Sequence, residues 1–281
     1  MKLQAPRIGL VDIYGGLMPV GWARWLFEQY EFPYERIYPQ ALDAGNLNAK
    51  YDVIVLMDGA YRRRDASRAG EMRAGSGEGL PPGMDASMIS AEFRSWLGHI
   101  SEDKTVPQLK QFVEAGGAVV AVGSSTGLGE LLGVPVTNHL TEIDRGVERP
   151  LPPDKFYIPG SLLQVSVDNT DPLAYGMPDH VDVVFDNSPV FRMDPDAAQR
   201  HATAVAWFAG PKVLESGWAW GQQYLDGGTE AVDASVGRGR VILLGPKITF
   251  RGQPHATFKL LFNGVLLGAA TGTGTAAEGG Q

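Results

Sequence analysis

The chain has no cysteine among its 281 residues. Disulfides, thiolate metal ligands and cysteine nucleophiles are therefore excluded. It also lacks any apolar run approaching the roughly 20 residues of a membrane-spanning helix, so we expect no membrane span. The start, MKLQAPRIGLVDIYGG, has no apolar core after its basic residue, and we expect no signal peptide there.

Basic charge is also scarce, with 24 Lys and Arg against 32 Asp and Glu and a net charge of −8. Such a chain has no general attraction for nucleic acid or anionic lipid, and we expect no nucleic-acid partner. An arginine cluster, residues 62–64 with Arg68 and Arg73, lies in a Gly- and Ser-rich stretch. We interpret that stretch as a solvated loop.

Apolar residues make up 44% of the chain, enough for a sizeable core. In the first half, strand-like runs alternate with helix-like runs, which predicts an α/β fold with a parallel sheet and helices on both faces. Ligands in such sheets bind beyond the carboxyl ends of the strands. The expected strands are 7–13, 34–38, 52–57 and 118–122, and the expected helices are 17–30 and 106–115.

The second half predicts additional short strands, a late hairpin that returns to the main sheet, and a closing helix. We expect one domain over residues 1–268, with a loop-like insertion at 60–104 and a disordered tail at 269–281. The expected elements are strands 162–167, 181–185, 203–208 and 213–216, the hairpin 231–244 and the helix 256–267.

Residues 123–127, Gly-Ser-Ser-Thr-Gly, follow a strand and precede a helix-like stretch. This G-x-S-x-G spacing is that of a nucleophile elbow, which makes Ser125 a candidate nucleophile. The candidate base is His255, just before the last helix, because a serine needs a base to take its proton. The alternative is that the hydroxyls of Ser124, Ser125 and Thr126 cap the following helix.

Polar residues at the strand ends are candidate ligand-binding groups, namely Asp12, Asp58 and Ser124. An acid is also needed to orient the histidine of a catalytic site. Asp12, Asp58 and Glu130 are all available, and no spacing selects among them.

Arg251, Gln253 and His255 alternate in the sequence RGQPH. In an extended segment they would point to one side and line a cleft that holds a carboxylate or a sugar hydroxyl. The alternative is that Arg251 pairs internally and Gln253 satisfies backbone groups.

The tryptophans have two interpretations. Spacing typical of helices and strands favours core packing. A carbohydrate-binding platform would instead need exposed rings grouped on one surface. The residues concerned are Trp22, Trp25, Trp207, Trp218 and Trp220.

Several sequence segments point to a family, and the resemblance runs from residue 7 to about residue 267. The segments are GWARWLFEQYEFPYERI, LDAGNLNAKYDVIVL, LKQFVEAGGAVVAVGSST, PGSLLQVSVDNTDPLAYGMP and FRGQPHATFKLLFN. With the order of elements, they resemble the flavodoxin-like fold of class I glutamine amidotransferases. More specifically, the chain resembles the domain found C-terminal to the catalytic domain in bacterial zinc carboxypeptidases.

The sequence departs from that family in two respects. True glutamine amidotransferases carry a cysteine at the elbow, where this chain has Ser125, so hydrolysis by a thiolate is excluded. The peptidase half is missing, so the resemblance places zinc only in a linked peptidase domain. One H-x-x-E string, His139 to Glu142, falls in a predicted exposed loop, and we expect no metal or cofactor in this chain.

The resemblance implies a non-catalytic accessory domain that scaffolds, docks on a zinc carboxypeptidase catalytic domain, or binds a small ligand. It would be secreted or periplasmic if it belongs to a larger exported peptidase. A serine hydrolase using Ser125 and His255 is the alternative, and a carbohydrate-binding module is the second alternative.

Overall fold

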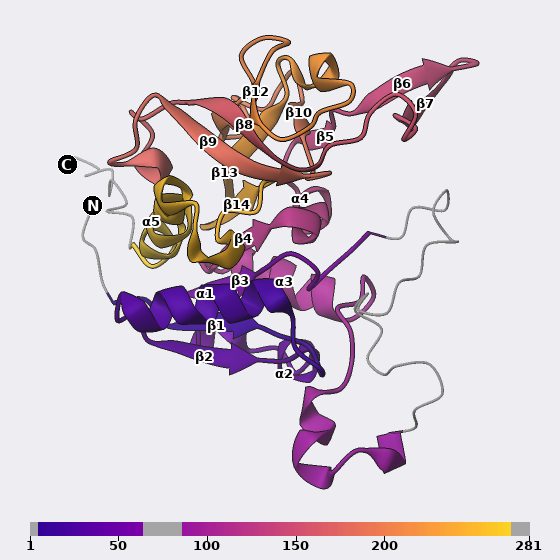
Figure 1. The fold of residues 1–281 in the computed structure, drawn as a ribbon. Helices are drawn as coiled ribbons and strands as arrows, with labels where there is room; N and C mark the ends of the chain where they lie inside the picture. The colour runs from indigo at the N-terminus through magenta and orange to yellow at the C-terminus, as the bar shows by residue number, and fades with distance from the viewer. Residues whose placement is uncertain (1–4, 64–85, 271–281) are drawn as a thin grey trace, which may run out of the picture.

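The computed structural model describes residues 5–63 and 86–270, and within them twelve strands form one sheet (Figure 1). Five strands are joined as parallel neighbours in the order β2-β1-β3-β4-β14. They are β1 Ile8–Val11, β2 Tyr34–Ile37, β3 Val53–Leu56, β4 Ala118–Val122 and β14 Gly239–Leu244. The predicted parallel sheet is therefore confirmed.

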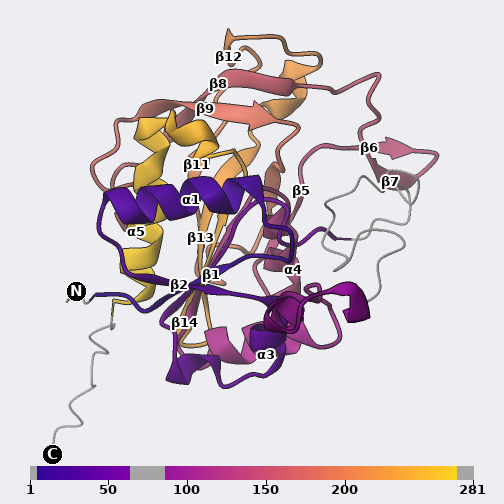
Figure 2. The same cartoon turned by 60° about the horizontal axis from the view of Figure 1, so that its bottom comes forward.

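The rest of the sheet is antiparallel and extends from β14 to the edge strand β12 (Figure 2). The predicted hairpin is confirmed, because Ala231 of β13 pairs with Leu244 of β14, and β14 then runs parallel to β4. The strands are β5 Val136–Asn138, β8 Pro159–Val167, β9 His180–Asp186, β10 Phe191–Met193, β11 Ala202–Trp207, β12 Leu214–Ser216 and β13 Thr229–Val236. A separate ribbon of β6 Thr141–Asp144 and β7 Val147–Pro150 projects from the body.

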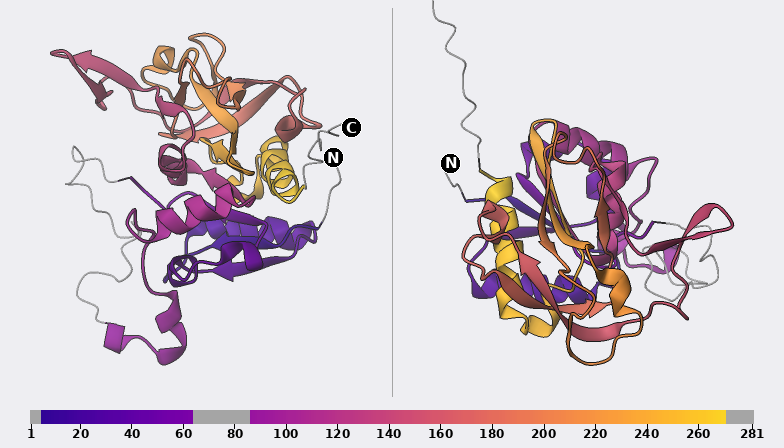
Figure 3. Two further views of the ribbon diagram at one scale, coloured as in Figure 1. Left: turned by 180° about the vertical axis from the view of Figure 1, so that it is seen from behind. Right: turned by 90° about the horizontal axis from the view of Figure 1, so that it is seen from above.

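Helices cover both faces of the parallel strands, as the alternation of elements predicts. One apolar core lies under α1 and α5, and a second lies under α2, α3 and α4 on the opposite face. Figure 3 shows the molecule from behind. Every residue of β1, β3 and β4 is buried, because both sides of these strands are covered. The helices are α1 Met18–Gln29, α2 Pro39–Asp43, α3 Thr105–Glu114, α4 Leu128–Leu131 and α5 Phe258–Gly268.

The predicted insertion at 60–104 is described only in part. Residues 86–104 contain two short 3₁₀ helices, Ala86–Met88 and Ala91–Trp96. Residues 64–85, with most of the arginine cluster, and the tail from 271 onward lie outside the described residues. No helix in the described ranges is long and apolar enough to cross a membrane.

The expectation that the tryptophans pack in the core is wrong for three of the five. Trp25, Trp218 and Trp220 are 44%, 54% and 53% exposed. Trp22 and Trp207 are half-buried. Exposed rings therefore need an explanation other than core packing.

Candidate functional site

The turn after β4 has its strained residue at Gly123, not at Ser125. A nucleophile elbow carries its nucleophile on a sharp, strained strand-to-helix turn. Here Gly123 directly follows β4 with φ of 59°, a left-handed conformation that suits glycine. Ser125 lies two residues further on, inside the 3₁₀ helix Gly123–Gly127. The G-x-S-x-G spacing thus matches the pattern, but the elbow position is occupied by a residue without a side chain.

The Ser125 hydroxyl is buried and fully engaged with the main chain. The residue is 0% exposed. Its Oγ donates a hydrogen bond to the Met57 carbonyl at 2.7 Å and accepts one from the Tyr61 N–H at 3.1 Å. Ser124 Oγ similarly accepts a hydrogen bond from the Gly59 N–H at 2.9 Å. Both serines therefore tie the turn after β4 to the loop after β3.

Helix capping, the alternative interpretation of the three hydroxyls, is wrong. Neither the 3₁₀ helix nor α4 has a side-chain hydrogen bond at its N-cap. The hydroxyls of Ser124 and Ser125 bond to the neighbouring loop, and Thr126 Oγ1 donates to the Gly123 carbonyl at 2.7 Å. The turn is thus stabilised by contacts between two strand ends.

Asp58 closes the same turn with its carboxylate. Oδ1 accepts a hydrogen bond from the Ser124 N–H at 2.9 Å. A Cβ on Gly123 would lie only 2.7 Å from the Asp58 side chain. In an elbow hydrolase, the N–H of the residue after the nucleophile helps to bind the oxyanion. With Gly123 at the elbow position, the corresponding N–H is that of Ser124, and it is already bound to the Asp58 carboxylate.

The residues of RGQPH do not form the predicted extended segment. Arg251 lies in the 3₁₀ turn Phe250–Gly252 with φ of 54°, His255 begins the 3₁₀ turn His255–Thr257, and Gln253 and Pro254 connect the two. The side chains of Arg251, Gln253 and His255 are exposed. The prediction of an extended segment is therefore wrong.

These side chains make local contacts instead of lining the turn after β4. The Arg251 guanidinium lies 5.2 Å from the centre of the Phe250 ring, and the His255 and Phe258 ring centres are 5.2 Å apart. Within the described residues, no hydrogen bond joins His255 to Ser125. A serine–histidine pair is not assembled.

The candidate acids lie in different surroundings. Asp12 is 3% exposed, and its Oδ1 accepts hydrogen bonds from the N–H groups of Ile13 at 2.9 Å and Leu17 at 3.0 Å. It therefore shapes the loop between β1 and α1. Glu130 forms an ion pair with Arg63 at the surface. Of the predicted ligand-binding residues, Asp58 lines the pocket described next.

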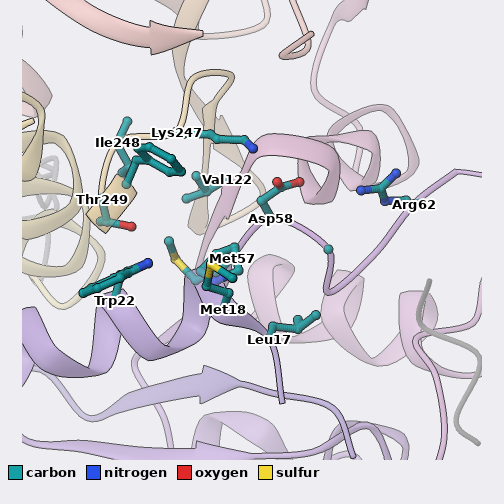
Figure 4. Close-up of a pocket in the computed structure, with 13 residues that line it drawn as sticks. Leu17, Met18, Trp22, Met57, Asp58, Arg62, Val122, Lys247, Ile248 and Thr249 are labelled. Atoms are coloured by element: carbon teal, nitrogen blue, oxygen red, sulfur yellow. The ribbon is translucent and has the colours of Figure 1, made fainter. Parts of the chain in front are cut away.

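A pocket of about 260 Å³ opens where α1 meets the carboxyl ends of β3, β4 and β14 (Figure 4). This position agrees with the rule that parallel sheets bind ligands beyond the ends of their strands. Its walls are mainly apolar, with a small number of polar groups, as is usual for small-molecule sites. The lining residues are Leu17, Met18, Pro19, Trp22, Met57, Asp58, Gly59, Arg62, Val122, Lys247, Ile248, Thr249 and Phe250.

The polar groups of the pocket include one donor without a partner. Trp22 Nε1 is buried and makes no hydrogen bond within the described part of the chain, and Figure 4 shows its indole among the lining side chains. Lys247 pairs with Asp186 and lies 5.7 Å from the centre of the Phe250 ring. The pocket thus contains an unpaired indole N–H, an ammonium group that is already paired with Asp186, and the Asp58 carboxylate.

Sequence reasoning missed Lys247 and Thr249 as pocket residues. Both follow β14, which reaches the parallel sheet through a late hairpin. The usable signal was their position just after the last parallel strand, since strand ends of a parallel sheet meet at one edge.

The H-x-x-E string does not bring its two residues to one centre. Glu142 forms an ion pair with Lys155. His139 is half-buried rather than exposed, and burial lowers the pKa of its imidazole, although main-chain contacts with Tyr224 and Asp226 oppose that shift. Within residues 5–63 and 86–270, no cluster of three or more metal-ligating side chains occurs.

The fold is that of flavodoxin-like, class I glutamine amidotransferase-like domains. No family model and no curated protein matches the sequence. Among solved structures, the chain is similar to a GMP synthase component from Thermoplasma acidophilum, with a TM-score of 0.52 and 10% identity over 95% of this chain and 96% of that one.

Two further structures show the same arrangement. A ThuA-like protein from Parabacteroides merdae has a TM-score of 0.50 and 12% identity, over 96% of this chain and 91% of that one. A β-galactosidase from Bacillus circulans sp. alkalophilus also gives a TM-score of 0.50 at 12% identity, over 92% of this chain and 30% of that one. At such identities the likeness shows the fold alone, because one fold hosts many functions.

Proposed function

We propose that the chain is a non-catalytic, amidotransferase-like accessory domain of a bacterial zinc carboxypeptidase, and that it binds a small ligand in the pocket beside α1. The observation that carries the non-catalytic part of the proposal is the state of the elbow. Gly123 occupies the strained position without a side chain, and the next N–H is bound to Asp58. Acyl transfer needs both a nucleophile and a free oxyanion site.

The serine-hydrolase alternative has no comparable support. Ser125 Oγ donates its proton to a main-chain carbonyl, whereas an activated serine donates it to a base. His255 is exposed and packs near Phe258. A rearrangement of two strand-end loops would be required before these two side chains met.

The pocket supports the ligand-binding part of the proposal. A partly apolar ligand with a hydrogen-bond acceptor would satisfy the buried Trp22 N–H, which otherwise carries the cost of an unpaired donor. An anionic group on that ligand would be attracted by Lys247, in competition with Asp186 and against the Asp58 carboxylate. Small aromatic carboxylates combine these properties.

Thermal-shift titrations with benzoate, phenylacetate and indole-3-acetate test the pocket. We expect at least one of them to raise the melting temperature of the native chain, and Trp22→Phe to weaken the response about tenfold or more. Trp25→Phe is the matched control, because Trp25 is exposed on the same helix and does not line the pocket. An equal response in both variants would exclude recognition by the Trp22 N–H.

The peptidase association rests on the resemblance of these sequence segments to the domain found beside bacterial zinc carboxypeptidases, and it needs its own test. The purified chain is mixed with the catalytic domain of a bacterial zinc carboxypeptidase of the resembled type and passed over a size-exclusion column. We expect co-elution, with peptidase activity confined to the catalytic domain. Separate elution at micromolar concentration would argue against the association.

A further inference from the structure

Three exposed aromatic side chains lie together near the sheet edge formed by β12. Tyr157, Trp218 and Trp220 are 44%, 54% and 53% exposed, and we call them the aromatic platform. Trp218 and Trp220 follow shortly after β12, which forms one end of the sheet, whereas β2 forms the other end (Figures 1 and 2). None of the three residues lines the pocket beside α1. The platform is thus a separate feature.

The backbone directs these three rings to one side. Tyr157 and Trp220 form an antiparallel bridge, with hydrogen bonds of 3.0 Å and 3.1 Å between their main chains. Directly opposed residues project to the same face, and the Trp218 ring lies against the Tyr157 ring. The neighbours of Tyr157, namely Phe156 and Ile158, are buried. The alternation therefore places small or core-forming residues inside and the large rings outside.

Hydrogen bonds hold the main chain of Trp218 and the ring of Trp220. Ser161 Oγ accepts a hydrogen bond from the Trp218 N–H at 2.9 Å and donates one to the Trp218 carbonyl at 2.6 Å. Trp220 Nε1 donates to the Asp154 carbonyl at 2.7 Å. The Tyr157 and Trp218 ring centres are 6.0 Å apart at an interplanar angle of 67°. Rings fixed in this way lose little conformational entropy when a ligand covers them.

Gly217 and Gly221 allow the backbone to present this segment. Their φ values are 103° and 81°. A Cβ on Gly217 would collide with Ser161, and one on Gly221 would collide with the main chain at Lys155. Both glycines are therefore required by left-handed conformation and by close packing. The segment between them is built so that its two tryptophans stay outside.

We propose that the aromatic platform binds a neutral saccharide chain. A pyranose ring presents apolar C–H groups on its face, which pack against an exposed aromatic ring, and hydroxyls at its rim, which remain in water or meet polar neighbours. Lys155 beside the platform is already paired with Glu142, and the net charge of −8 disfavours an anionic polymer.

The size of the platform favours a saccharide over a protein. Three aromatic rings of 150–250 Å² each, about half exposed, offer roughly 300 Å². One side of a stable protein interface covers about 800 Å². A protein partner would therefore have to cover many further residues around the aromatic platform, whereas the platform alone is large enough for about two or three sugar units.

Native-gel electrophoresis in hydroxyethylcellulose or glycol chitin tests the proposal, with titration of cellohexaose and N-acetylchitohexaose followed by tryptophan fluorescence. We expect at least one polymer to retard the native chain and the matching oligosaccharide to change the emission. Trp218→Ala and Tyr157→Ala should each weaken binding at least tenfold. Trp25→Ala and Tyr175→Ala are matched controls, because these rings are exposed elsewhere, and they should bind like the native chain.

Thermal melts confirm that each variant is folded, and Trp218→Gln replaces Trp218→Ala if the latter is not. The proposal is wrong if neither polymer nor oligosaccharide binds, or if the platform variants bind as well as the controls. It is also wrong if the native chain self-associates and Trp218→Ala makes it monomeric without any saccharide binding. That result would identify a protein interface instead.

Discussion

The carboxylate of Asp58 accepts a hydrogen bond of 2.9 Å from the main-chain N–H of Ser124. This bond joins the end of β3 to the end of β4 at the point where an elbow hydrolase binds an oxyanion. The residue before it, Gly123, has no side chain to act as nucleophile. The turn thus has the backbone path of a nucleophile elbow. The N–H that would bind an oxyanion there, that of Ser124, is hydrogen-bonded to the Asp58 carboxylate instead.

Replacing Asp58 should destabilise the turn in proportion to the lost hydrogen bond. Asp58→Asn keeps an acceptor and loses the charge, so we expect a decrease of about 1 kcal/mol in the free energy of unfolding. Asp58→Ala should cost about 2 kcal/mol, because the Ser124 N–H loses its partner. Urea denaturation measures both. Asp154→Asn, with its exposed side chain, is the control, and equal effects at the two positions would contradict the role of Asp58.

Gly123 should tolerate no side chain while Asp58 is present. Gly123→Ala places a Cβ at a φ of 59° and 2.7 Å from Asp58. The left-handed φ alone costs about 1–2 kcal/mol, and the collision should add to it. Gly133→Ala is the matched control, because Gly133 has a φ of 93° with open space around it.

A double-mutant cycle separates the two causes. Asp58→Gly removes the colliding side chain, so the cost of Gly123→Ala should fall by about 1 kcal/mol or more in that background. The unfolding free energies of the four proteins give the coupling. Strictly additive effects would show that Asp58 does not block the elbow position.

Ser125 should prove structural. Ser125→Ala leaves the Tyr61 N–H and the Met57 carbonyl without their partner, and each buried unpaired group costs about 1–3 kcal/mol. Calorimetry or urea denaturation would measure this loss. Ser235→Ala, at an exposed strand position, should change stability by less than about 0.5 kcal/mol. A Ser125→Ala protein as stable as the native chain would contradict the assigned contacts.

The fold follows from the sequence because buried parallel strands and amphipathic helices leave strong periodic patterns. The four expected strands of the first half and the closing helix all occur within a few residues of their expected bounds. Whether a segment forms a strand or a helix follows from the spacing of its buried residues, and the apolar residues of the sequence show that spacing directly.

The site was less predictable because it depends on backbone conformation and on contacts between distant loops. The spacing G-x-S-x-G does not show which residue takes the left-handed φ, and the structure gives that conformation to Gly123. The alternation in RGQPH predicts an extended segment, but Arg251 also has a positive φ and turns the chain. The spacing of Trp218 and Trp220 indicates that they share one side, yet the period of a strand does not show whether that side is covered.

Stability should fall as pH rises because of a buried carboxyl in β13. Glu230 is fully buried with both oxygens unpaired in the described part of the chain, and burial raises its pKa well above the ordinary value. The folded state therefore holds a proton that the unfolded state releases above about pH 4. Each unit of difference in pKa removes about 1.4 kcal/mol as the pH rises.

Asp233 adds to this effect over a narrower range. Burial raises its pKa to about 6, in spite of the opposing Arg240. Its contribution is therefore lost between about pH 4 and pH 6, and Glu230 accounts for the slope above pH 6. Glu230→Gln should flatten the stability profile above pH 6, whereas Asp233→Asn should flatten only the lower part. Chemical denaturation from pH 4 to pH 9 measures both, and a Glu230→Gln profile as steep as the native one would contradict the assignment.

Labelling with a fluorophosphonate probe tests the inactive elbow most directly. The folded native chain is incubated with the probe beside a known serine hydrolase, and the peptide that contains Ser125 is examined by mass spectrometry. We predict no adduct on Ser125, because its hydroxyl is buried and bonded to Met57 and Tyr61. A stoichiometric adduct on Ser125 in the folded chain, lost in His255→Ala, would contradict the account and establish a serine hydrolase.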